Sequence, residues 1–143
     1  MKSTLSLSDQ RDYRTKANSP SGTISDSDTF TYDAASRMLT AVSGRYSNTV
    51  TFTYDIAGRL ASEALTYGGQ TYTVSREYDT EGRVKKLTYP DGSTVERTYT
   101  ARGQLDQLKY NGNVIDTRVY DDGGRMTSST YGNGVVNTYT YRP

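Results

Sequence analysis

The stretch Tyr54-Asp55-Ile56-Ala57-Gly58-Arg59-Leu60 decides the fold, because the chain returns to this pattern at a nearly constant interval. Successive motif tyrosines are 22, 24, 21, 21 and 21 residues apart. Self-similarity at such a period predicts one supersecondary unit that is stacked several times. The motif tyrosines are Tyr32, Tyr54, Tyr78, Tyr99, Tyr120 and Tyr141.

The motif places an aspartate four residues before an arginine in four of its five complete copies. The fourth copy has Thr100 and Gln104 instead, so it lacks both members of the pair. Loss of both residues together predicts that the Asp and Arg contact each other, either within one turn or between neighbouring repeats. If the pair is exposed, its ion pair contributes only about 0–1 kcal/mol, and its main role is to fix the register.

Each period also splits into two strand-like runs that are joined by a second turn. The run ending at Tyr89 is followed by Pro90-Asp91-Gly92-Ser93, and the run ending at Tyr110 is followed by Asn111-Gly112. Asp-Gly and Asn-Gly between β-rich runs are typical of hairpin turns, because these residues tolerate positive φ. No helical periodicity extends far. We therefore expect an all-β fold of about ten antiparallel strands in five stacked hairpins, with negligible helix.

Alternation along the strands predicts which side chains share a face. Val50, Phe52 and Tyr54 lie two residues apart and belong to one face, whereas Thr51 and Thr53 belong to the other. On the outgoing strand of the third unit, Val84 lies three residues before Leu87, and Leu105 lies three before Leu108. This repeated offset predicts a β-bulge near the start of each outgoing strand.

The composition makes tyrosine the main source of apolar surface. The chain has 143 residues, of which 14 are Tyr, and Leu, Ile, Val and Phe together number only 22. We expect the motif tyrosines to form a stacked core ladder, since each ring can bury about 150–250 Å². The formal net charge of +1 argues against a nucleic-acid partner, which usually requires a basic face. No apolar run is long enough to predict a signal peptide or a membrane span.

The motif turn has its own chemistry. Its Asp is expected to accept hydrogen bonds from backbone N–H groups two or three residues later. Gly58, Gly82, Gly103 and Gly124 are expected to adopt the left-handed conformation, in which a Cβ costs about 1 kcal/mol or more. Ser36 occupies that position in the first copy, so its turn should be strained or differently shaped.

The sequence indicates no catalytic, cofactor or metal site. It contains no His and no Cys, which removes the usual catalytic triads and the common zinc ligands. Glycine-rich phosphate-binding motifs are absent. The pairs Asp26/Asp28 and Asp121/Asp122 could offer oxygen ligands to Ca²⁺ but lack EF-hand spacing, so ordinary turn chemistry is the preferred interpretation. The prediction is a non-enzymatic protein with no cofactor.

The recurring Y-D-x-x-G-R-L pattern resembles the YD repeat of Rhs proteins, teneurins and the insecticidal toxin-complex family. The resemblance covers roughly Phe30 to Tyr141. It implies a long β-hairpin spiral that closes into a hollow shell in full-length members. In bacterial members the shell encloses a toxic C-terminal segment, released by aspartate-dependent self-cleavage near a D-P-x-G-type motif, which this sequence lacks. It implies a secreted or cell-surface location.

Together these observations predict a structural YD-repeat module, an open segment of a β-shell that encapsulates a toxin. The expected partners are other YD repeats, copies of the chain joined through edge strands, and an enclosed toxin segment. Two alternatives remain: an extracellular adhesion or glycan-binding module, and a β-repeat protein that self-assembles head-to-tail through its edge strands. The sixth motif stops after Tyr141-Arg142-Pro143, which favours a fragment or a module completed by another chain.

The expected domain organisation is an irregular lead-in, cap or diverged hairpin at 1–28, followed by five repeats and the start of a sixth at 29–143. Five further tyrosines close the outgoing strands and are candidates for an exposed contact surface. These are Tyr46, Tyr67, Tyr89, Tyr110 and Tyr131. The structural motif residues are Tyr32, Asp33, Arg37, Tyr54, Asp55, Gly58, Arg59, Tyr78, Asp79, Gly82, Arg83, Tyr99, Gly103, Tyr120, Asp121, Gly124, Arg125 and Tyr141.

Overall fold

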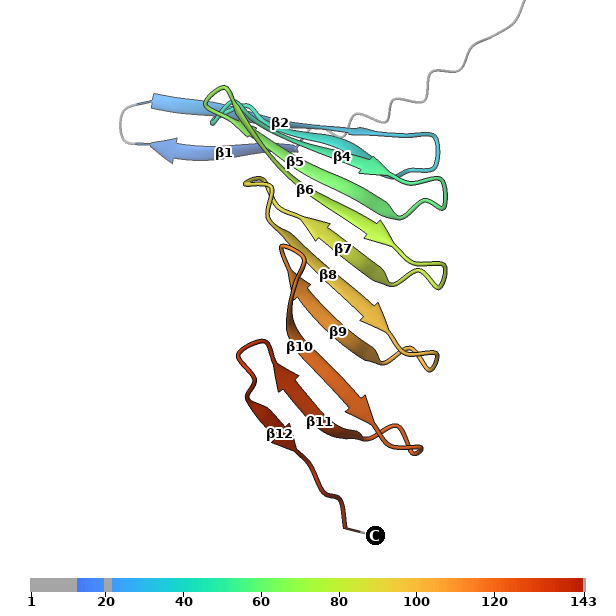
Figure 1. Cartoon of the computed structure of the whole chain (residues 1–143). Coiled ribbons are helices and arrows are strands. Elements are labelled where there is room, and N and C mark those ends of the chain that lie inside the picture. The colour runs from blue at the N-terminus through green and yellow to red at the C-terminus, as the bar shows by residue number, and fades with distance from the viewer. Residues whose placement is uncertain (1–12, 20–21, 143) are drawn as a thin grey trace, which may run out of the picture. The chain divides into compact units, whose positions relative to one another are not determined.

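The computed structural model describes residues 13–19 and 22–142, with side chains from residue 27 onward. Every regular element in these residues is a strand, which confirms the all-β prediction (Figure 1). The strands are β1 (Tyr13–Ser19), β2 (Gly22–Tyr32), β3 (Met38–Ser43), β4 (Asn48–Tyr54), β5 (Leu60–Tyr67), β6 (Gln70–Tyr78), β7 (Val84–Thr88), β8 (Thr94–Tyr99), β9 (Leu105–Tyr110), β10 (Asn113–Tyr120), β11 (Met126–Tyr131) and β12 (Val136–Thr138).

The chain divides into two compact units, Met1–Thr73 and Val74–Pro143. The first unit holds β1 to β5 and the start of β6, and the second holds the rest of β6 and β7 to β12. Within each unit the described strands pair antiparallel with the strands before and after them in the sequence. Each unit is therefore a meander of consecutive hairpins.

The described part of the lead-in is a hairpin. β1 pairs with β2 from Tyr13 opposite Asp28 to Ser19 opposite Gly22. β2 then continues without interruption through Phe30 to Tyr32 and pairs with β3. This hairpin accounts for the two strands beyond the ten that we expected. A cap at 1–28 stays a prediction, because residues 1–12, 20 and 21 lie outside the described residues.

The motif turn has one geometry in its described copies. In the second copy, the Gly58 N–H donates to the Asp55 carbonyl and the Asp55 N–H donates to the Arg59 carbonyl, both at 2.9 Å. Gly58 has a φ of 80°, as this turn requires. Ser36 takes the same position in the first copy with a φ of 61°, and its N–H donates to the Asp33 carbonyl at 3.0 Å. The serine is thus held in a costly left-handed conformation, and the alternative of a differently shaped turn is wrong.

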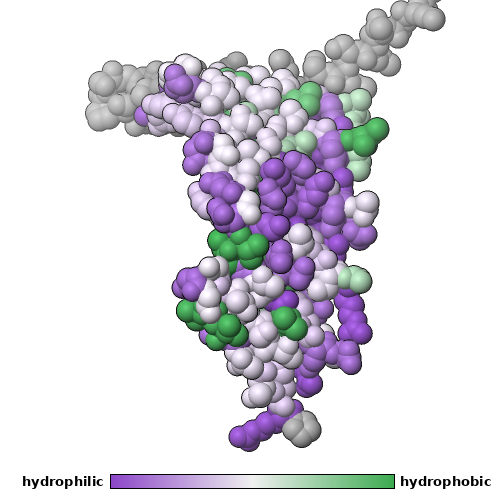
Figure 2. Space-filling model, in the orientation of Figure 1, coloured by the Kyte–Doolittle hydropathy of each residue, from purple (hydrophilic) through white to green (hydrophobic). Residues whose placement is uncertain are grey.

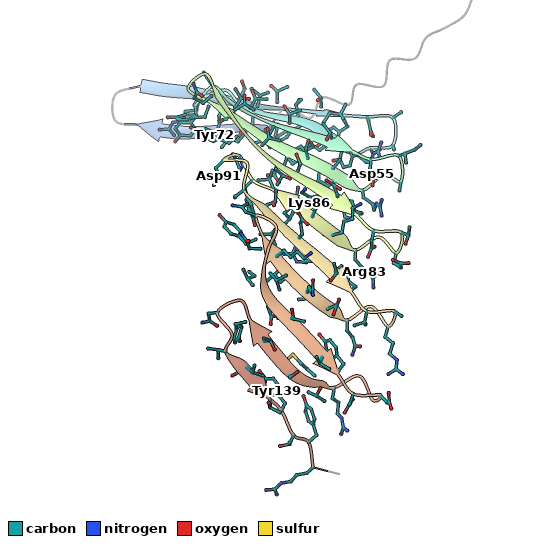
Figure 3. The ribbon with its side chains drawn as sticks, in the orientation of Figure 1. Asp55, Tyr72, Arg83, Lys86, Asp91 and Tyr139 are labelled. Carbon is teal, nitrogen blue, oxygen red and sulfur yellow. The ribbon has the colours of Figure 1, made fainter. Side chains whose placement is uncertain are left out.

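The second turn of each hairpin lies at the other end of the strands. In the second unit, Figure 3 shows Arg83 at one end and Asp91 at the other. Asn111 and Gly112 both have positive φ, 47° and 78°, which identifies a type I′ turn. The Tyr131 turn instead repeats the hydrogen bonds of the motif turn, with the Gly134 N–H donating to the Tyr131 carbonyl at 2.8 Å. The predicted hairpin turns are confirmed.

The predicted β-bulge is present where each described motif tyrosine meets the next strand. Thr98 lies opposite Gln107, but Tyr99 lies opposite Leu105, so Asp106 is the extra residue on β9. The same shift occurs where Tyr32, Tyr54, Tyr78 and Tyr120 pair. Since the bulge recurs in each copy, it changes the register by one residue in the same way at every repeat.

The described side chains form no buried apolar core. No hydrophobic side chain among them is fully buried, and the only two buried residues are polar, Asp116 at 6% and Ser129 at 3% exposed. The expected core ladder of motif tyrosines is therefore wrong as a buried core: Tyr54 and Tyr99 are half-buried, and Tyr141 is 46% exposed. The reason is that described strands contact only their sequence neighbours, so no second layer covers the faces within a unit. The face seen in Figure 2 is mostly hydrophilic or neutral, with small hydrophobic patches.

Candidate functional site

The motif Asp and Arg form an ion pair inside their own turn. The Arg Nε donates to the Asp Oδ2 at 2.7 Å in Asp33–Arg37 and Asp55–Arg59, at 2.6 Å in Asp79–Arg83, and at 2.8 Å in Asp121–Arg125. The other carboxylate oxygen, Oδ1, accepts the backbone N–H of the same arginine at 2.8–2.9 Å in all four copies. The expected contact is therefore present, and it lies within one turn.

These hydrogen bonds hold the carboxylates in the charged form. The backbone N–H of Arg37 is the main cause that lowers the pKa of Asp33 below the ordinary 3.8, and the backbone N–H of Arg59 acts likewise on the pKa of Asp55. Partial burial raises the pKa of Asp79, but the hydrogen bonds from Arg83 outweigh it, so this pKa is also lowered. The pKa of Asp121 is lowered mainly by the backbone N–H of Arg125.

These shifts predict that acid weakens the fold. A carboxylate whose folded pKa is depressed stabilises the protein above its unfolded pKa, and this stabilisation is lost as pH falls through the folded value. The urea midpoint should therefore stay nearly constant from pH 7 to about 5 and fall steadily below about pH 4. Urea unfolding followed by circular dichroism at several pH values measures this. A midpoint unchanged between pH 7 and about 2.5 would contradict the assignment.

Four motif tyrosines dock on the preceding repeat through their hydroxyl groups. The Tyr54 hydroxyl donates to the Met38 carbonyl at 2.8 Å, and the Tyr99 hydroxyl donates to the Val84 carbonyl at 2.9 Å. The same bond joins Tyr120 to Leu105 and Tyr141 to Met126, both at 2.8 Å. In these four bonds the acceptor is the backbone carbonyl of the residue directly after the arginine, or after Gln104, of the preceding motif. The bond therefore links consecutive repeats in one fixed register.

The motif arginine also reaches the next repeat. The guanidinium of Arg37 lies 4.6 Å from the ring centre of Tyr54, and that of Arg83 lies 4.3 Å from the ring centre of Tyr99. Arg125 and Tyr141 repeat this arrangement at 4.9 Å. A cation over an aromatic face is attracted by the ring quadrupole. One arginine thus joins its own aspartate to the tyrosine of the following repeat.

The motif glycine leaves room for that arginine. A Cβ built on Gly103 would lie 3.0 Å from the Nη1 of Arg83, and one built on Gly58 would lie 3.1 Å from the Nη1 of Arg37. Both distances are shorter than ordinary van der Waals contacts. The glycine therefore has two roles, to supply positive φ and to admit the preceding repeat's guanidinium. We call the Asp–Arg pair, the next tyrosine and the next glycine the docking contact.

The fourth copy replaces the ionic part of the docking contact with neutral hydrogen bonds. The Gln104 N–H donates to the Thr100 Oγ1 at 3.2 Å, as the motif arginine N–H does to Asp elsewhere. The Gln104 side-chain amide reaches the next repeat and donates to the Gly124 carbonyl at 2.6 Å. The Arg102 guanidinium donates to the Asp122 carbonyl. The substitution therefore keeps the link between repeats but removes its ion pair.

This natural substitution suggests a direct test of the Asp–Arg pair. Changing Asp79→Thr alone leaves Arg83 without its aspartate, and changing Arg83→Gln alone leaves Asp79 without its cation. The double variant copies the Thr100/Gln104 pair, so its loss of stability should be smaller than the sum of the two single losses. Urea unfolding of the four proteins measures this coupling. Strictly additive losses would contradict a mutual contact.

The five tyrosines that close the outgoing strands, which we call the tip tyrosines, are all exposed. The exposed fraction is 60% for Tyr46, 58% for Tyr67, 39% for Tyr89, 45% for Tyr110 and 42% for Tyr131. Arg45 lies 5.2 Å from the ring centre of its neighbour Tyr46. These tyrosines therefore have free surface available, and a contact role for them remains a proposal.

Sequence reasoning did not find every contact. It missed the acceptor of the tyrosine hydroxyl and the stacking of arginine on the next tyrosine, although equal spacing of the motifs was a usable signal. It also missed the buried Asp116, whose carboxylate accepts from Ser129 Oγ and from Arg118 Nε, both at 2.7 Å. Nothing in the repeat pattern distinguishes this aspartate. Within the described residues, no group of three or more Asp, Glu, His or Cys could hold a metal ion, and no helix could cross a membrane.

Within each unit, consecutive hairpins joined by recurring docking contacts define a β-sheet built from repeats. The chain belongs to the Teneurin YD-shell family, whose model matches residues 23–113. This match confirms the resemblance to YD repeats, and with the meander of hairpins it identifies the chain as a segment of a YD shell fold. No curated protein sequence matches the chain.

Solved toxin structures share the fold. A chain in the crystal structure of TcdB2-TccC3-Cdc42 is 23% identical with a TM-score of 0.66, over 82% of this chain and 6% of that chain. A chain in the Photorhabdus luminescens Tc holotoxin pore, which carries a mutation in TccC3, is 23% identical with a TM-score of 0.61, over 73% of this chain and 5% of that chain. The present chain thus spans a small part of the chains it matches, and the likeness concerns the fold.

Proposed function

We propose that this chain is a non-enzymatic wall segment of a YD-repeat shell that encloses a toxic polypeptide. The docking contact between repeats carries this proposal. It uses the motif arginine together with the tyrosine hydroxyl and the glycine of the following motif, as in Arg83, Tyr99 and Gly103, to join one hairpin to the next. Such an arrangement extends a wall, because each repeat contacts only its neighbours.

The chemistry of the motif residues supports a structural role. The polar groups of Asp79, Arg83 and Tyr99 are bonded to backbone or to one another and are not directed into a cavity. The open hollows on the described surface are shallow, and the 430 Å³ one beside the fourth motif turn is lined by Thr100, Gln104 and Asp121, whose polar groups already serve the turns. An enclosed toxin and a secreted or cell-surface location are inferred from the family and from the Tc toxin structures that share its fold.

A protease-protection experiment tests the proposal. The protein is purified with whatever polypeptide accompanies it, treated with proteinase K under native conditions, and the surviving fragments are identified by mass spectrometry. The expected result is a second polypeptide segment that survives in the wild type and is digested when Tyr99→Ala and Tyr120→Ala remove two docking contacts. Recovery of the protein with no protected segment would contradict the shell role.

Two other functions keep a specific observation in their favour. The exposed tip tyrosines could stack on sugar rings, and a glycan array with Tyr67→Ala and Tyr110→Ala variants tests this adhesion role. The three residues of β12 pair only with β11 among the described strands, so its outer backbone groups could join another copy head-to-tail. Light scattering at high micromolar concentration decides this point: a monodisperse monomer contradicts self-assembly.

A further inference from the structure

The two faces of the second unit differ in chemistry. We call the face that carries Val95, Arg97 and Tyr99 the tyrosine face, and the side that carries Glu96 and Thr98 the opposite face. The strand register extends the tyrosine face across Arg76, Leu87, Val95 and Tyr110 in one row and Arg97, Leu108, Asp116 and Tyr131 in the next.

Charges on the opposite face compensate one another. Glu77, Lys86, Glu96 and Lys109 follow one another in a cross-strand row of alternating sign. Lys85 Nζ lies 3.5 Å from Glu77 and Lys86 Nζ lies 3.4 Å from Glu96. Two more charged residues lie on this face: Lys85, and the bulge residue Asp106, which accepts a hydrogen bond from Thr98. The face therefore carries three cations and three anions. Such a balanced, lysine-rich face is typical of a surface that stays in solvent.

The tyrosine face is not compensated in this way. On this face β8 to β10 carry Arg97 and Arg118 against a single carboxylate, Asp116. Asp116 is bonded to Arg118 at 2.7 Å. Arg97 has no ion pair among the described residues, although it is half-buried between strands that bear Leu87 and Leu108. All three lysines with described side chains lie on the opposite face.

This composition matches the core of a protein interface. Interface cores are enriched in Arg and Tyr and depleted of Lys and Glu. The patch around Arg97 consists of the half-exposed side chains Leu87, Val95 and Leu108 and the exposed Tyr110. An unpaired guanidinium on an apolar patch favours a partner that supplies a carboxylate together with apolar side chains.

We propose that the tyrosine face of the second unit binds an extended polypeptide segment in which acidic residues alternate with apolar ones. The carboxylate would pair with Arg97, and the apolar side chains would cover Leu87, Val95 and Leu108. A second copy of the chain fits this face poorly, because two tyrosine faces in contact would bring arginines together. The inference rests on the proposed function in one respect: the polypeptide bound by this face is taken to be the one that the shell encloses.

Fluorescence anisotropy with the full chain tests this inference. The probe is a fluorescein-labelled twelve-residue peptide in which Glu alternates with Leu, and the matched peptide has Lys in place of Glu. The wild type should bind the Glu peptide at least tenfold more tightly than the Lys peptide. Arg97→Gln should weaken binding at least tenfold, whereas Lys109→Gln, on the opposite face of the next strand, should change it less than twofold. Thermal unfolding of both variants checks that they fold.

Several outcomes would overturn the inference. These are absence of binding by the wild type, equal effects of the two substitutions, and equal affinity for the two peptides. Heparin that binds more tightly than the peptide in an Arg97-dependent way would identify a polysaccharide partner instead. A dimer that Arg97→Gln dissociates would identify a second copy. Peptide binding without a protease-protected segment contradicts only the shell role, and the reverse contradicts only this inference.

Discussion

Replacing Tyr99 with alanine is expected to lower the free energy of unfolding by about 2–4 kcal/mol. The loss combines the removed ring contacts, which cost less than in a full core because the ring is half-buried, with the lost hydroxyl bond to the Val84 carbonyl. The stacking of Arg83 on the ring is lost as well. Urea unfolding followed by circular dichroism measures the change.

Two companion variants separate the contributions. Tyr99→Phe keeps the ring and removes only the hydroxyl, so it should cost about 1 kcal/mol. Thr98→Ala changes the exposed neighbour on the opposite face and should cost about 0.5 kcal/mol or less. Equal losses at Tyr99 and Thr98 would show that the face assignment is wrong. No loss in Tyr99→Phe would show that the hydroxyl does not contribute to docking.

The sequence predicted the hairpins well because their signals are local. Asn111-Gly112 requires positive φ at both residues, and the Tyr54 heptapeptide repeats at a constant interval, so the turns and the repeat register could be read directly. The offset between Leu105 and Leu108 likewise revealed the bulge. The ion pair of Asp79 and Arg83 was visible through the one copy that lacks it.

Contacts between repeats could not be predicted in the same way. The regular spacing of the motifs indicates that equivalent residues of neighbouring repeats lie near one another, but it does not identify the atoms that bond. The Tyr99 ring was expected in a core, but no second layer covers it, and its stability comes from Arg83 and a backbone carbonyl. Asp116 pairs with Arg118 of its own strand, whereas Arg97 lies opposite Leu108 and has no ion pair among the described residues. The repeat pattern does not distinguish these two positions.

Gly103→Ala is expected to be the most informative single-methyl change, with a loss of about 2–3 kcal/mol in unfolding free energy. Gly103 has a φ of 82°, which alone costs an L residue about 1–2 kcal/mol. Its new Cβ would also lie 3.0 Å from the Nη1 of Arg83, which is held by Asp79 and stacked on Tyr99 and so cannot move freely.

Gly92 is the matched control for this change. It also has a φ of 82° and its N–H makes the same turn hydrogen bond, to the Tyr89 carbonyl at 2.9 Å, but nothing lies within 4 Å of its Cβ position. Gly92→Ala should therefore cost only the backbone part, about 1–2 kcal/mol. In an Arg83→Ala background the Gly103→Ala loss should fall to the Gly92→Ala value, since the obstructing guanidinium is gone. If Gly103→Ala costs no more than Gly92→Ala when Arg83 is present, the arginine does not pack against the next repeat's glycine and the docking contact reduces to the tyrosine.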